Sequence, residues 1–130
     1  CFSDGKAKLL AVNWINLSEN VWKDFPLILN TGRCVEHFHT RTKTGSIGIL
    51  NNLAPRAWVE INSADAKKLK VKSGDLISIS SKRGKVSDIV VKVTQTIKEG
   101  TILVPFHFNK QLVNLLVIDD FASKSFEPNF

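Results

Sequence analysis

The feature that most constrains the fold is a series of short apolar segments, each closely followed by a turn-forming stretch. They are strand-sized and rich in valine, isoleucine and leucine, and several alternate apolar with polar residues. The segments predicted as strands are 26–30, 57–61, 76–80, 86–94 and 101–104. In the fourth, Ile89, Val91 and Val93 are expected on one face and Val90 and Lys92 on the other.

The connections between these strands restrict the possible folds further. Residues 81–85 join the third and fourth strands through a short segment with a glycine, which predicts a β-hairpin. Pro105 is expected to end the last strand or to place it at a sheet edge. A short helix is expected after Asn62, whose side chain can cap it, with Ala66 and Leu69 buried. Many short strands with little helix favour a mainly β protein, and a barrel more than a sandwich.

The length and composition are those of one soluble domain. The chain has 130 residues, 43% hydrophobic and 23% charged, with no apolar run long enough to span a membrane and no signal peptide pattern. Cys1 and Cys34 have no metal or redox spacing, so a reducing cytoplasm is expected. The chain begins at cysteine and contains no methionine, which suggests a piece of a longer protein. Residues 1–26 are interpreted as a lead-in from a preceding domain and 27–130 as the barrel domain.

The stretch after the first predicted strand gathers many polar groups within ten residues. It holds a guanidinium, two imidazoles and two hydroxyls, which are donors suited to phosphate and to the edge of a heterocycle. Its glycine allows a sharp turn or a close approach to a ligand, and loops after strands often carry binding residues. The segment is therefore predicted to bind a ligand. Its candidate residues are Thr31, Gly32, Arg33, Glu36, His37, Phe38, His39 and Thr40.

The two histidines of this segment allow three interpretations. His37 and His39 lie two residues apart, so on a strand they would face the same side. A metal site is one interpretation, and it needs a third ligand, for which only His107 or a carboxylate could serve. Hydrogen bonding to a polar ligand is favoured over a metal. The third interpretation is that loop backbone alone satisfies both rings.

A second concentration of ring side chains follows the last predicted strand. Phe106, His107 and Phe108 are contiguous, and Asn114 follows eight residues after Phe106, which suits a pocket wall with an amide donor. The alternative is that Phe106 or Phe108 closes the barrel core. The sequence shows no catalytic triad spacing and no phosphate loop of the Walker or dinucleotide type. The chain is thus interpreted as a binding module without catalytic residues of its own.

The net charge of +6 is compatible with nucleic acid, an anionic cofactor or simple solubility. The lysines are scattered instead of forming one helical stripe, which weakens the nucleic-acid interpretation. On charge alone, a solvated basic surface is the favoured explanation.

The motifs in combination resemble one family over most of the chain. The residues that carry the resemblance include Thr31, Gly32, Arg33, Glu36, His37, Phe38, His39, Thr40, Thr42, Lys43, Thr44, Gly45, Ala54, Pro55, Gly74, Asp75, Arg83, Gly84, Pro105, Phe106, His107, Phe108, Asn114, Leu115 and Leu116. In this order and spacing they resemble the C-terminal domain of molybdopterin oxidoreductases, in particular nitrate reductases of the bacterial assimilatory and periplasmic type.

The resemblance implies a fold and a cofactor. The family domain is a double-psi β-barrel that closes over molybdenum held by two molybdopterin guanine dinucleotides (bis-MGD). It implies that residues 31–40 contact pterin and phosphate groups, with Arg33 as a charge partner, that Asn114 is a further cofactor contact and that Phe106 faces the substrate channel. The family's closing lysine would fall beyond Phe130, so the domain is expected to be truncated at its C-terminus.

The resemblance also implies partners. The iron–sulfur cysteines and the metal-ligating residue of the family lie in domains outside this sequence, so the isolated chain is expected to be inactive. The expected partners are those domains and an electron donor such as ferredoxin or a reductase subunit, with no membrane and no nucleic acid. The function predicted is cofactor binding within a cytoplasmic nitrate reductase. Alternatives are the same domain of a formate dehydrogenase, or a free-standing β-barrel that binds proteins or nucleic acid.

Overall fold

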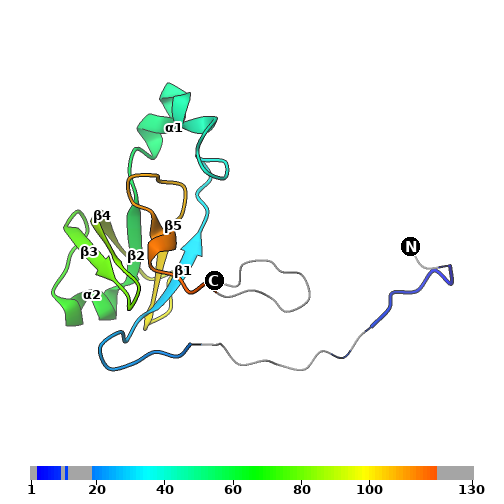
Figure 1. Cartoon of the computed structure of the whole chain (residues 1–130), viewed down its shortest axis with the longest axis horizontal. Helices are drawn as coiled ribbons and strands as arrows, with labels where there is room; N and C mark the ends of the chain where they lie inside the picture. The colour runs from blue at the N-terminus through cyan, green and yellow to red at the C-terminus, as the bar shows by residue number, and fades with distance from the viewer. Residues whose placement is uncertain (1–2, 10, 12–18, 120–130) are drawn as a thin grey trace.

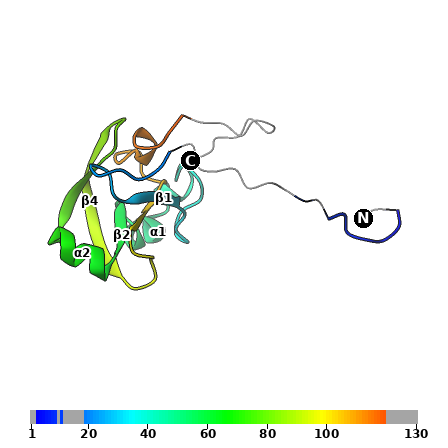
Figure 2. The same ribbon diagram turned by 90° about the horizontal axis from the view of Figure 1, so that it is seen from below.

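The computed structural model describes residues 3–9, 11 and 19–119, and these contain a five-stranded sheet with a few short helices (Figure 1). The strands are β1 (Ile28–Gly32), β2 (Trp58–Asn62), β3 (Leu76–Ser80), β4 (Lys85–Thr94) and β5 (Thr101–Pro105). Seen from below, the sheet curls instead of lying flat (Figure 2). The predicted fold class, a mainly β barrel of the double-psi type with short helices, is confirmed, with the described strands forming a curled half-barrel.

The order of the strands, β1-β5-β2-β4-β3, combines two parallel pairs with two antiparallel contacts. β1 runs parallel to β5 and β2 parallel to β4, whereas β2 is antiparallel to β5 and β3 to β4. In the first pair Gly32 lies opposite Pro105, so the carboxyl ends of β1 and β5 meet at one edge of the sheet. The segments that leave β1 and β5 therefore start side by side.

All five predicted strands are present, with ends shifted by at most two residues. β1 starts at Ile28 instead of residue 26 because Pro26 has no amide hydrogen to donate, and the first bond joins Ile28 N–H to the Gly100 carbonyl at 2.8 Å. Pro105 ends β5, which lies inside the sheet between β1 and β2. The predicted hairpin is confirmed as the antiparallel β3–β4 pair.

An irregularity in β4 keeps its apolar residues on the core side. Ile89 and Val91, which were predicted to share a face, are both buried, but Val86, three residues before Ile89, is buried too. Between them the register slips by one residue, because Ile77 pairs with Ile89 and Ile79 with Val86. Asp88 sits at φ 61° in this bulge, and the extra residue restores the inward orientation of Val86.

The helices occupy opposite ends of the sheet (Figure 1). The helix α2 (Ser63–Leu69) follows β2, and Asn62 caps it by accepting the Ala64 amide at 2.8 Å, as predicted. Ala66 is buried as expected, but Leu69 is 52% exposed, so the prediction that Leu69 docks the helix was wrong. The other end carries the 3-10 turn η1 (Thr44–Ser46) and α1 (Gly48–Leu53), and no helix was predicted from the sequence for either segment. A second 3-10 turn, η2 (Val113–Leu115), lies near the end of the described residues.

No helix among the described residues is both long and apolar enough to cross a bilayer.

Asp65 anchors α2 to the turn between β4 and β5. Its buried carboxylate accepts the Gly100 amide at 2.6 Å and the Lys68 ammonium at 3.3 Å. The Gly100 hydrogen bond, with a smaller contribution from Lys68, lowers the pKa of Asp65 below its ordinary value of 3.8. A lowered pKa means that the ionised carboxylate stabilises the folded state at pH values above its unfolded pKa, and that this contribution is lost as the pH falls through the folded pKa.

Replacing Asp65 with alanine is therefore expected to lower the free energy of unfolding by about 1–2 kcal/mol at pH 7. The difference from the unsubstituted chain should shrink below about pH 4, where the carboxylate itself becomes protonated. Urea unfolding at several pH values measures both effects. The matched control is Lys68→Ala, which leaves the Gly100 bond intact and should change stability much less. An equal cost in the two variants would show that the Gly100 bond is not the anchor.

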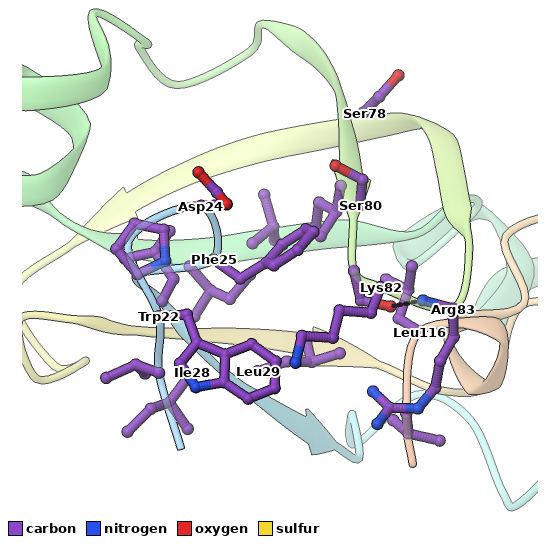
Figure 3. A pocket seen from close by; sticks show the side chains of 18 of the residues that line it. Trp22, Asp24, Phe25, Ile28, Leu29, Ser78, Ser80, Lys82, Arg83 and Leu116 are labelled. Atoms are coloured by element: carbon purple, nitrogen blue, oxygen red, sulfur yellow. Dashed lines mark hydrogen bonds between the residues drawn. The ribbon is translucent and has the colours of Figure 1, made fainter. Parts of the chain in front are cut away.

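A cavity of about 560 Å³ lies inside the curl of the sheet, lined by β2, β3, β4, residues 19–29 and residues 116–118 (Figure 3). Residues 19–26, which were assigned to the lead-in, lie at this cavity. Trp22 and Phe25 exchange two backbone hydrogen bonds there, and the Lys82 ammonium stacks on the Trp22 ring. Glu19 forms ion pairs with Lys82 and with Arg83, the latter at 2.7 Å. Residues 1–2, 10 and 12–18 of the lead-in, and residues 120–130, after which the truncation is predicted, lie outside the described residues.

Candidate functional site

The two segments that the sequence marked as candidates leave the sheet at the same edge. The segment after β1 begins beside the segment after β5, and the Phe106 amide donates to the Gly32 carbonyl at 3.2 Å. The first segment runs through η1 and α1 and returns to the start of β2 at Trp58. Strand pairing thus brings residues 31–40 next to residues 105–108 although they are far apart in sequence.

His107 connects the two segments as a buried clamp, with only 1% of its surface exposed. Its Nε2 accepts the Cys34 amide at 2.9 Å, and its Nδ1 pairs with the His39 carbonyl. A ring nitrogen that accepts an amide hydrogen carries no proton, so the proton is on Nδ1, which donates to His39. His107 is therefore the neutral Nδ1–H tautomer, and it uses both nitrogens to hold the segment after β1.

His37 is likewise used inside the protein. It is 5% exposed, its Nε2 donates to the Ala54 carbonyl at 2.8 Å, and its Nδ1 lies 3.1 Å from the Thr44 hydroxyl. The same hydroxyl accepts the Phe38 amide at 3.2 Å, so its own hydrogen is free to reach Nδ1. His37 thus joins the start of the segment to η1 and to the end of α1. This geometry corresponds to the interpretation in which protein groups satisfy the ring.

The expectation that His37 and His39 face the same side was wrong, because this segment is a turn and not a strand. His39 has φ 44° and is exposed, whereas His37 points into the protein. Among residues 3–9, 11 and 19–119, no three His, Cys, Asp or Glu side chains are grouped as metal ligands.

The remaining predicted residues divide by exposure. Arg33, Phe38, His39 and Thr40 are exposed, while Thr31, Gly32 and Glu36 are half-buried. Asn114 is exposed in η2, and within the described residues no hydrogen bond links it to residues 31–40. Phe106 is half-buried and packs against the main core, and Phe108 is 1% exposed in a second cluster with Trp58. The core interpretation therefore describes Phe108, and Phe106 in part.

Gly32 lies close to the neighbouring strand. A Cβ atom at this position would lie 3.0 Å from the Leu103 side chain of β5, closer than ordinary van der Waals contact. The close approach explains the glycine through packing between β1 and β5.

Burial raises the pKa of the nearby Cys34 thiol, so Cys34 is an uncharged side chain at neutral pH and packs against the Trp58 cluster.

Arg41 was not among the predicted residues, although it is central to this edge. Its Nη2 donates to the Asn51 side chain of α1, and its guanidinium carbon lies 5.0 Å from the centre of the Phe108 ring. Its backbone is left-handed at φ 64°, and its side chain passes over Gly45, where a Cβ would lie 3.0 Å from Arg41 Cγ. The only feature of the sequence that points to Arg41 is Gly45, four residues later. A glycine at this spacing is too common to single out one arginine.

Comparison with known proteins identifies the domain. The sequence profile described as "Molydopterin dinucleotide binding domain" matches residues 27–130. The chain belongs to this family. The resemblance found in the sequence is thereby confirmed, and the edge described above belongs to a molybdopterin dinucleotide-binding domain.

Relatives of this domain occur in several enzymes. The alpha subunit of an F420-dependent formate dehydrogenase from Methanocaldococcus jannaschii is 37% identical over 113 residues, 87% of this chain. A periplasmic nitrate reductase from Desulfovibrio desulfuricans is 34% identical over 133 residues, 99% of this chain. The chain spans only 17% and 18% of these two relatives. Acetylene hydratase from Pelobacter acetylenicus shares the fold, with a TM-score of 0.67 and 23% identity over 75% of this chain and 15% of its own.

The exposed groups at this edge fit a phosphorylated, heterocyclic cofactor. The turn carries the guanidinium of Arg33, the imidazole of His39 and the hydroxyl of Thr40 on its surface. Within the described residues the amides of positions 39, 40, 42 and 43 donate no hydrogen bond, so they are available to an anion. Free amides on a turn with left-handed residues are a common way to bind phosphate. The enclosed Nε of Arg41 also has no partner there. The molybdopterin dinucleotide therefore fits this edge of the domain.

Proposed function

We propose that this domain holds a molybdopterin guanine dinucleotide cofactor of a molybdenum-dependent nitrate reductase. The observation that carries the proposal is the Gly32–Pro105 pairing, which places the segment after β1 next to the segment after β5 at one edge. Arg33, His39 and Thr40 would bind the cofactor from this edge, and its molybdenum, when bound, supplies the oxygen-atom transfer that converts nitrate to nitrite. His37 and His107 hold the turn that carries these donors.

The domain's own contribution is positional. Exposed donors that are already oriented lose less conformational entropy on binding than a mobile segment would. The His107 bonds to Cys34 and His39 and the His37 bonds to Ala54 and Thr44 supply this order. The proposed enzyme also has iron–sulfur and metal-binding domains outside this sequence and binds a second dinucleotide. It would take electrons from a soluble donor such as ferredoxin and act in the cytoplasm.

Nitrate is proposed as the substrate because the nitrate reductase aligns over a larger share of the chain. The periplasmic nitrate reductase aligns over 99% of the chain, against 87% for the formate dehydrogenase subunit. A formate dehydrogenase is the second candidate, and it is favoured by the higher identity of 37%. Both candidates would bind the cofactor at the same edge of the domain. They differ in their substrate, which is nitrate for one and formate for the other.

Steady-state assays of the full-length enzyme separate the two candidates. Nitrite formation from nitrate with reduced viologen as donor is expected, with little oxidation of formate under matched conditions. The oxidised pterin released by denaturation should yield a guanine nucleotide on hydrolysis. Formate oxidation without nitrate reduction would support the second candidate, and a preparation free of pterin would contradict both.

A further inference from the structure

Arg41 is a cation with an incomplete set of partners. It is half-buried, its Nε is enclosed without a hydrogen-bond acceptor, and only its Nη2 donates within the described residues, to Asn51. Its Nη1 has no acceptor among the same residues. The guanidinium is nevertheless fixed, because it also stacks on Phe108.

No carboxylate among the described residues balances this charge. The ion pairs found there involve Lys68, Lys82 and Arg83 as the cations, and none involves Arg41. Asn51 offers a neutral amide oxygen, which satisfies a hydrogen bond but not a charge. Because a partly buried charge is costly unless it is paired, an unbalanced guanidinium beside a phosphate-binding turn indicates an anionic ligand.

The position of Arg41 agrees with such a role. It lies in the same turn as His39 and Thr40, two residues before the unpaired amide of Lys43. Its left-handed backbone is unfavourable for a non-glycine residue, and its head group completes no ion pair within the described residues. Arginine also matches phosphate oxygens better than lysine because its donors form a rigid fork.

We propose that Arg41 is an additional binding residue for the phosphate part of the dinucleotide, with its guanidinium held in place by Asn51 and Phe108. This inference rests on the proposed function, in that the cofactor is bound at this edge. The phosphate supplies the missing counter-charge.

The test uses the cofactor-loaded full-length enzyme and the variants Arg41→Gln, Arg41→Lys and Lys72→Gln. Glutamine and lysine experience the same left-handed backbone as arginine, so differences between them report on the head group. Lys72→Gln removes one charge from an exposed position next to α2, at the opposite end of the sheet. The rate of pterin release is followed by fluorescence after oxidation, and the thermal midpoint of each cofactor-free enzyme is measured.

Arg41→Gln is expected to release pterin about 10–100-fold faster, the effect of losing one charge-assisted hydrogen bond. Arg41→Lys should be slower than Arg41→Gln, Lys72→Gln should match the unsubstituted enzyme, and the cofactor-free midpoints should agree. Unchanged release from Arg41→Gln would overturn the inference. Equal release from the lysine and glutamine variants with lowered midpoints would also overturn it, because it indicates a purely structural role.

Arg33→Ala in the same assay separates this inference from the proposed function. Fast release from Arg33→Ala with normal release from Arg41→Gln would refute only the role of Arg41. Normal release from both would place the cofactor elsewhere and refute both.

Discussion

Replacing His107 with leucine is expected to lower the free energy of unfolding by about 2–4 kcal/mol. Leucine fills a similar volume but can neither accept the Cys34 amide nor donate to the His39 carbonyl. Both backbone groups would lose their partner where the segment after β1 crosses the segment after β5. The buried His107 site would be left without either hydrogen bond, and the two part-buried backbone groups would recover only some of their hydrogen bonding from water, which makes this a large effect for a domain of this size.

Urea unfolding of the chain measures this cost, with His39→Ala as the matched control. Only the backbone carbonyl of His39 takes part in the clamp, and its imidazole is exposed. Its removal should therefore change stability by less than about 0.5 kcal/mol. His107→Asn, which keeps one donor and one acceptor on a shorter side chain, should fall between the two. If His107→Leu were as stable as the unsubstituted chain, His107 would not be a clamp.

The strands could be predicted because their signals are local. Alternation of apolar residues, glycine-containing connections and Pro105 mark where β2, β3, β4 and β5 begin and end. The capped start of α2 is local too, since Asn62 bonds to an amide two residues away. The bulge at Asp88 is not local, because the identity of the residue opposite it depends on how β3 pairs.

α1 and η1 were missed because their sequence opposes a helix. The segment 44–53 contains two glycines, two asparagines and two isoleucines, and neither helix has a side-chain cap. Their position is set by tertiary contacts, including the bonds from His37 to Thr44 and Ala54. Such contacts cannot be inferred from propensity.

Strand pairing places the candidate segment beside residues 105–108, but the roles of its histidines were not evident from the sequence. A histidine in a polar turn can face solvent or the interior, and the choice depends on acceptors far along the chain. For His107 the partner amide is 73 residues away. Arg41 was overlooked for the same reason, because neither its contact with Phe108 nor its lack of an ion pair within the described residues is visible locally.

The second large effect is expected from Arg33→Ala, which should leave the fold intact and weaken the hold on the cofactor. Arg33 is exposed directly after β1, and no ion pair involves it within the described residues. Losing its guanidinium should therefore cost little stability. Its charge-assisted bonds to a phosphate would be lost, which corresponds to about 10–100-fold weaker retention.

Cofactor content per molecule of purified full-length enzyme, by metal analysis and pterin fluorescence, measures retention, and calorimetry of the cofactor-free enzyme measures stability. Lys98→Ala is the matched control, because Lys98 is an exposed cation in the turn before β5, at the edge opposite Arg33. Retention should fall in Arg33→Ala alone, and both variants should unfold like the unsubstituted enzyme. Full cofactor loading of Arg33→Ala would mean that this exposed guanidinium does not contact the dinucleotide. A matching loss in Lys98→Ala would trace the effect to net charge instead of to the edge formed by β1 and β5.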